Sequence, residues 1–94
     1  MTLDEVLDEF NAGKTSIRCS RVRELLEALG FEVRDGKQGG HKIFVHDQLP
    51  DFYSGSYNCG HGKNPEVKPA YIKKIIQVLK QHSSTLEELN GRTQ

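Results

Sequence analysis

The first ten residues of the chain carry apolar side chains at the spacing of one helix face. The positions i, i+3, i+4 and i+7 are filled by Leu3, Val6, Leu7 and Phe10. Thr2 and Glu5 have the spacing of a capping box, and Gly13 suits the end of a helix. We therefore expect an amphipathic N-terminal helix, followed by a polar connector that reaches Cys19.

Two further segments show the same helical spacing. A helix is predicted from Ser20, as N-cap, to Leu29, and its apolar stripe consists of Val22, Leu25, Leu26 and Leu29. Another begins at Pro69, a residue that suits the first turn, and its stripe consists of Ile72, Ile75, Ile76 and Leu79. The capping-box spacing recurs at Ser84–Glu87 and predicts a short final helix.

Between these helices the pattern changes to the alternation that is typical of strands. Phe31–Arg34 and His41–His46 are rich in β-branched and aromatic residues, and a turn with three glycines, Asp35–Gly40, joins them. Such a pair predicts an antiparallel hairpin. A third strand, with poorer alternation, is expected at Ser54–Cys59, and Gly60–Lys68 is expected to be irregular.

The predicted fold class is α+β. We expect a three-stranded antiparallel sheet that helices cover on one face, with the acidic N-terminal helix as an addition. The other face would stay open, so a ligand surface is expected there or at the edge of the hairpin. We divide the 94 residues into an N-terminal helix and connector at 1–19, an α+β domain at 20–82 and a C-terminal tail at 83–94. The apolar stripe of the first helix must pack on this domain, on another copy or on a partner chain.

The charge is distributed unevenly, although the net charge is zero. Residues 1–13 contain four acids and no base, and residues 83–94 have a small acidic excess. Residues 14–82 carry a surplus of five positive charges. A basic middle between acidic ends permits phosphate binding but does not demand it.

We infer the cellular compartment and the absence of a cofactor from features that the sequence does not contain. No apolar run approaches the length of a membrane helix, and acids follow Met1 where a secretory signal has basic and then apolar residues. We therefore expect a cytoplasmic protein without membrane contact. Cys19 and Cys59 could pair in principle but are expected to be reduced thiols there. Cys59-Gly60-His61 lacks the paired spacings of a zinc site, so we expect no metal and no cofactor.

Three separated motifs together resemble a known family. Leu29-Gly30-Phe31, the later Gly39-Gly40-His41 and the helix start Pro69-Ala70-Tyr71-Ile72 are similar to the pattern of HicA proteins over residues 20–80. The resemblance implies an α-β-β-β-α fold similar to double-stranded-RNA-binding domains. It also implies a toxin that cleaves mRNA and is neutralised by a HicB-type antitoxin. The family's strand histidine falls on His41, while Gly40 stands where the family commonly has serine.

His41 is the candidate for catalysis. Metal-independent RNA cleavage needs a group that removes the 2′-hydroxyl proton and one that protonates the leaving oxygen. Imidazole can do either near neutral pH, and the sequence leaves open whether water or the 2′-hydroxyl is the attacking group. Gly39 and Gly40 would let a phosphate come close to the start of the strand and bind it with their N–H groups. The plainer interpretation of His41 is an idle, solvent-exposed residue at the end of a hairpin.

Basic and polar residues around the hairpin and on the second helix are the predicted RNA contacts. Lys37 and Lys42 would neutralise phosphate charge, and Gln38 would hydrogen-bond a sugar or base. Arg21 and Arg23 lie off the apolar stripe of their helix and would contact phosphates. For each of them the plainer interpretation is a solvated surface. Arg18 and Lys63 have the same two interpretations. Tyr53 and Tyr57 could stack on bases, and their plainer interpretation is packing in the core or at the edge of the sheet.

Two questions stay open in the sequence. His41 shares strand parity with Ile43, and Lys42 shares it with Phe44, but nothing decides which pair faces the core. The function is also open between three classes: an endoribonuclease, an RNA-binding module without chemistry on the same fold, and a protein-interaction domain that forms a homodimer or binds a partner.

Overall fold

The computed structural model describes residues 1–13, 15–60, 62–63 and 65–89. The helices are α1 (Leu3–Ala12), α2 (Cys19–Ala28), α3 (Pro69–Gln81) and α4 (Ser83–Leu89). The strands are β1 (Ile17–Arg18), β2 (Glu32–Asp35), β3 (His41–Val45), β4 (Gly55–Asn58) and β5 (Glu66–Val67). The α+β class is therefore confirmed. The three predicted sheet strands differ from the observed ones by one residue at their ends.

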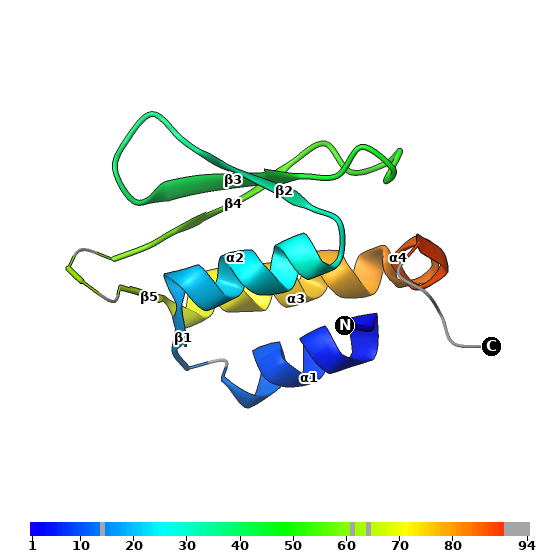
Figure 1. Cartoon of the computed structure of the whole chain (residues 1–94), viewed down its shortest axis with the longest axis horizontal. Helices are drawn as coiled ribbons and strands as arrows, with labels where there is room; N and C mark the ends of the chain where they lie inside the picture. The colour runs from blue at the N-terminus through cyan, green and yellow to red at the C-terminus, as the bar shows by residue number, and fades with distance from the viewer. Residues whose placement is uncertain (14, 61, 64, 90–94) are drawn as a thin grey trace.

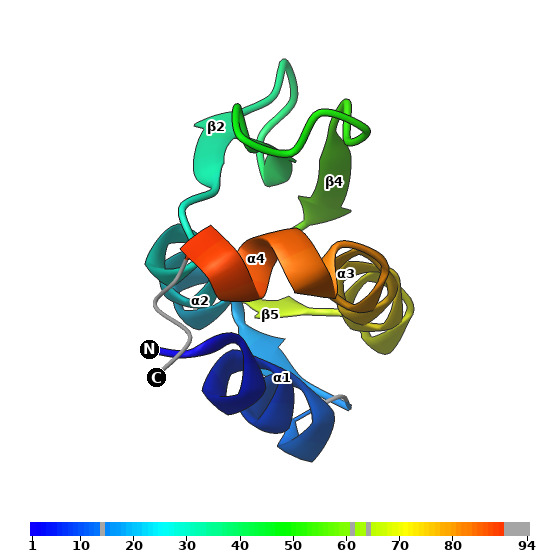
Figure 2. The same ribbon diagram turned by 90° about the vertical axis from the view of Figure 1, so that its right-hand side faces the viewer.

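The elements form three layers (Figures 1 and 2). Strands β2, β3 and β4 make an antiparallel sheet in the order β2-β3-β4. Helices α2 and α3 lie against one face of this sheet, and α1 lies on the far side of these two helices. No described helix lies on the other face of the sheet, so the expectation of a sheet covered on one side is met.

The strand register answers the question of parity. Val33 pairs with Phe44, and Lys42 pairs with Tyr57, so these four residues share the face that meets the helices. The exposed fraction is 1% for Phe44 and 0% for Tyr57. His41 pairs with Asn58, and both therefore lie on the open face. The β3 histidine thus stays outside the core because Phe44, and not Ile43, is the buried residue of the strand.

Helix α1 packs on the chain's own core. Leu3, Val6 and Phe10 are buried and belong to the same apolar cluster as Leu86 of α4. The predicted capping box is present, with the Thr2 hydroxyl accepting from the Glu5 backbone N–H and the Glu5 carboxylate accepting from that of Thr2. The N-terminal helix is therefore an integral layer of the fold.

A two-stranded ribbon joins the predicted polar connector before Cys19 to the segment Gly60–Lys68 that was predicted to be irregular. Ile17 of β1 pairs with Val67 of β5, and both side chains are buried. Each strand has two residues, which is too short to produce a visible alternation of apolar and polar positions. The ribbon brings the start of α2 next to the end of β4.

The two cysteines form a disulfide across this junction. Cys19 and Cys59 are bonded, with their Cα atoms 5.5 Å apart. The expectation of two reduced thiols is therefore wrong. The pairing was hidden because the cysteines are 40 residues apart in sequence and meet only through the β1–β5 ribbon and the bridge between Cys59 and Val67.

Within the described residues, no helix combines the length and the apolar character that crossing a membrane requires.

Candidate functional site

His41 lies in an open cleft on the uncovered face of the sheet. The cleft has a volume of about 550 Å³ and is lined by Lys37, Gln38, Gly39, His41, Ile43, Asn58 and Cys59. These residues come from the β2–β3 turn, from the start of β3 and from the end of β4. The His41 side chain is partly exposed, so a solute can reach the imidazole.

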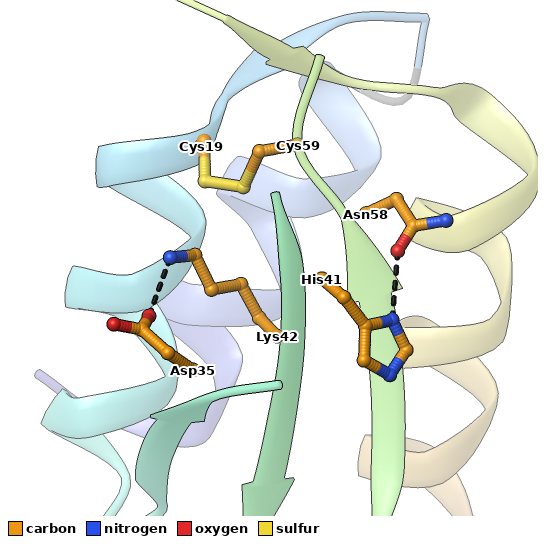
Figure 3. The surroundings of a disulfide bond; sticks show 6 residues. All are labelled: Cys19, Asp35, His41, Lys42, Asn58 and Cys59. Atoms are coloured by element: carbon orange, nitrogen blue, oxygen red, sulfur yellow. Dashed lines mark hydrogen bonds and ion pairs between the residues drawn. A yellow bond between two sulfur atoms is a disulfide. The ribbon is translucent and has the colours of Figure 1, made fainter. Parts of the chain in front are cut away.

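A hydrogen-bonded chain of side chains orients the imidazole. The Nδ1 atom of His41 lies 2.8 Å from the Oδ1 atom of Asn58. The Nδ2 atom of Asn58 donates to the hydroxyl of Tyr71, on α3, at 2.9 Å. With the amide nitrogen engaged by Tyr71, the oxygen faces His41, and this contact requires a hydrogen on Nδ1. The neutral ring then has its lone pair on Nε2, on the side away from Asn58 (Figure 3).

Two glycines shape the surroundings of the imidazole. The ring of His41 occupies the space that a Cβ at Gly36 would take. Gly40 has a φ of +85°, and a Cβ there would lie 2.6 Å from the carbonyl oxygen of Cys59. The Gly40 carbonyl also accepts a hydrogen bond from the Cys59 N–H at 2.7 Å. A left-handed backbone and a close strand therefore disfavour any side chain at position 40.

The cleft brings together part of the predicted RNA-contacting set. Lys37, Gln38 and Gly39 line it, and all three are exposed. Gly40 adjoins it through its contact with Cys59. The β2–β3 turn therefore delivers one cation, one amide and two backbone N–H groups to the neighbourhood of His41, in the segment where the sequence predicted them.

Lys42 is not part of this cleft. Successive residues of a strand point to opposite faces, and the side chains of His41 and Lys42 leave β3 in opposite directions (Figure 3). The Lys42 ammonium lies 2.6 Å from a carboxylate oxygen of Asp35. Its hydrogen bond lowers the pKa of the Asp35 carboxyl. The expectation that Lys42 supports chemistry at His41 is therefore contradicted by the alternation of the strand.

Arg21 and Arg23 have partners within the chain. Arg21 donates to the Glu9 carboxylate of α1, with one contact of 2.7 Å. The same guanidinium lies 3.1 Å from Glu24. Arg23 pairs with Glu27 at 3.2 Å and donates to the Val33 carbonyl at 3.0 Å. Neither arginine lines the His41 cleft, so the structure separates them from the candidate catalytic group.

The sequence pattern did not identify Asn58 or Tyr71 as residues of the site. Asn58 ends a strand with weak alternation, and Tyr71 lies in the first turn of a helix 13 residues later. The register His41–Asn58 brings the amide to the imidazole, and register is a property of the folded sheet. A hairpin register drawn from the β3–β4 pattern is the one signal that could have singled out Asn58.

Potential metal ligands do not cluster in the described part of the chain. No three histidine, cysteine, aspartate or glutamate side chains gather closely enough to hold an ion there. His61, considered above with Cys59 as a zinc pair, lies outside the described residues, and Cys59 is bonded to Cys19.

Comparison of the chain with protein-family models, with curated proteins and with solved structures finds no match.

Proposed function

We propose that this chain is a toxin-type endoribonuclease that cleaves mRNA, with His41 as its acid–base group. One observation carries the proposal: a partly exposed imidazole is held by Asn58 inside an open cleft that also contains Lys37. The succession α2, β2, β3, β4, β5 and α3, in which β5 lies outside the three-stranded sheet, supports the likeness to double-stranded-RNA-binding domains that the family resemblance implies.

The proposed reaction uses the 2′-hydroxyl of the RNA as the nucleophile. Nε2 of His41 takes its proton, the 2′-oxygen attacks phosphorus, and the bond from phosphorus to the 5′-oxygen breaks. The protonated imidazole then gives that proton to the leaving 5′-oxygen. The products are a 2′,3′-cyclic phosphate and a 5′-hydroxyl. Lys37 would neutralise the charge that develops on the phosphate oxygens.

Asn58 would keep the imidazole in the tautomer that this reaction needs. A neutral amide can accept from Nδ1–H both before and after Nε2 is protonated, so one hydrogen bond serves both stages. Tyr71 fixes the amide in turn. Both residues act through the imidazole and are therefore positioning residues.

The proposal extends to partners and location. A HicB-type antitoxin would neutralise the protein by covering the sheet face on which His41 lies. In a homodimer, two copies would contact each other through the same face. An mRNA substrate places the proposed activity in the cytoplasm. Because cytoplasmic thiols are usually kept reduced, activity should be measured with the Cys19–Cys59 bond both closed and open.

The catalytic role of His41 can be tested by substitution. The purified chain is expected to cut single-stranded RNA in the presence of EDTA, and His41→Ala to reduce the rate by about 100-fold or more, as for loss of a general acid–base group. Asn58→Ala should cause a smaller loss. Cleavage is followed on denaturing gels, and circular dichroism verifies that the variants are folded.

Two controls separate this function from its alternatives. A substrate with 2′-deoxy residues should resist cleavage, because the proposed nucleophile is missing. Equal cutting by His41→Ala would refute the catalytic role. Salt-sensitive retention of RNA without cleavage would instead favour a binding module on this fold, and no retention at low salt would count against both.

A further inference from the structure

A second basic pocket lies on the side of β3 that faces the helices. It has a volume of about 310 Å³. Its polar lining consists of Arg18, Ser20, Arg23, Lys42, Tyr57 and Lys63. The start of α2, the paired residues of β3 and β4, and the loop after β4 contribute to it. It is therefore distinct from the His41 cleft, which opens on the other face of the sheet.

The amino end of α2 enters this pocket without a capping group. The N-cap residue is Arg18, no side chain caps the first turn, and that turn contains no acid. The Cys19 N–H donates to the Pro65 carbonyl at 2.9 Å. The next N–H groups of a first turn have no acceptor inside a helix. An arginine at the positive end of the helix dipole is unfavourable unless an anion binds there.

The hydroxyl of Tyr57 is an independent sign of a ligand. Tyr57 is completely buried, and its hydroxyl has no hydrogen-bond partner among the described residues. Burial raises the pKa of Tyr57 to about 12, so the hydroxyl stays protonated and can donate. A buried donor without an acceptor is unfavourable and rare in folded proteins. Tyr57 is among the residues that line the pocket, so a ligand oxygen that reaches its hydroxyl would supply the missing acceptor.

The charge of the pocket favours an anion. Lys42 is paired with Asp35, and Arg23 is paired with Glu27. Arg18 and Lys63 have no ion-pair partner within the described ranges, so the pocket and the two paired carboxylates together carry a net charge of +2.

We infer that this pocket binds a phosphate group, with the first turn of α2 and the Tyr57 hydroxyl donating to its oxygens and Arg18 and Lys63 balancing its charge. The phosphate belongs either to the backbone of an RNA strand or to a terminal or free phosphate. The inference does not depend on catalysis by His41, because it concerns another face of the sheet.

The test is a titration of the 94-residue chain with inorganic phosphate, at constant ionic strength, followed by NMR of the backbone amides. Saturable shifts are expected at Ser20 and Arg21. Tyr57→Phe should weaken binding by about tenfold, the loss expected for one hydrogen bond to a charged group. Lys63→Gln should weaken it too. Tyr53→Phe is the matched control and should bind like the wild type, because Tyr53 is 95% exposed and lies outside the pocket.

Thermal unfolding provides a second test, which applies even if a substitution changes the stability of the chain. In buffer without phosphate, Tyr57→Phe should be at least as stable as the wild type, because it removes a buried donor that has no acceptor. Added phosphate should raise the Tm of the wild type more than that of Tyr57→Phe.

Oligonucleotides distinguish the two sources of phosphate. A 2′-deoxy strand with a 5′-hydroxyl that shifts Ser20 and Arg21 identifies a backbone phosphate. Binding only of inorganic phosphate and of a 5′-phosphorylated strand identifies a terminal or free phosphate. Absence of saturable shifts, equal affinity in Tyr57→Phe and Lys63→Gln, or shifts confined to residues 37–41 would each overturn the inference.

Discussion

The position of the His41 ring depends on a residue without a side chain. Gly36 leaves the space that the imidazole fills, and Asn58 then fixes the rotation of the ring through Nδ1. Gly36 does not have a left-handed backbone, so alanine is sterically allowed there except for the contact with His41. This glycine therefore offers a way to move the imidazole without changing it.

The prediction is that Gly36→Ala impairs RNA cleavage while the fold persists. The added methyl group overlaps the His41 ring and must displace it, and a displacement near 1 Å can reduce catalysis by about 100-fold. The imidazole resonances of His41 should shift in NMR spectra. Gly60→Ala is the control, because a Cβ there meets its neighbours only at ordinary contact distances. Equal activity of Gly36→Ala and the wild type would show that ring position is unimportant.

At the scale of elements, the helices and strands that the sequence predicted correctly are those with a long repeating pattern of apolar residues. α1 and α3 were readable because four apolar residues in each repeat at helical spacing, and β2 and β3 because β-branched and aromatic residues alternate. The strands β1 and β5 were missed because two residues form no pattern. Within the site, His41 and Lys37 were predicted because they lie close together in sequence, at the start of β3 and in the glycine-containing turn before it. Asn58 needed the register of β4, which only the assembled sheet provides.

Docking of α1 yields a prediction about pH. The hydrogen bond from Arg21 lowers the pKa of the Glu9 carboxyl, so the folded state favours its ionised form. This contribution to stability is present above the unfolded pKa of a glutamate, about 4.3, and is lost as the pH falls through the lower folded value. Glu9→Gln should therefore have a lower Tm than the wild type at pH 7, by a small margin because the pair is partly exposed.

Melting curves at pH 7 and below pH 4 provide the check. The difference in Tm between Glu9→Gln and the wild type should disappear in acid. Glu24→Gln is the comparison, because Glu24 contacts Arg21 from within α2 and does not join the two helices. A difference in Tm that persists in acid would show that the Glu9 charge is not what holds α1.

At the scale of the whole molecule, one apolar core is shared by the four helices that the described residues form. It extends from Leu3 in α1 to Leu86 in α4 and includes Phe44 of the sheet. The Cys19–Cys59 bond lies at one end of this core and closes a loop across 40 residues of sequence. Such a cross-link stabilises a protein mainly by restricting the unfolded chain.

Opening the disulfide should therefore lower the free energy of unfolding. A loop of this length corresponds to about 4 kcal/mol in the chain-entropy description. Urea unfolding of the oxidised and reduced chains, and of Cys19→Ser with Cys59→Ser, measures the effect as a shift in midpoint. Titration of free thiols before unfolding verifies the redox state. Coincident midpoints would show that the bond does not constrain the unfolded chain.

The closed loop also divides the molecule topologically. α2 and the strands β2, β3 and β4 lie inside the covalent ring, whereas α1, α3 and α4 lie outside it. Tyr53, the most exposed large hydrophobic side chain of the described residues, is at the surface of a segment within the ring. A protease that nicks the backbone there leaves two fragments that still migrate together, and they separate only when a reductant is added.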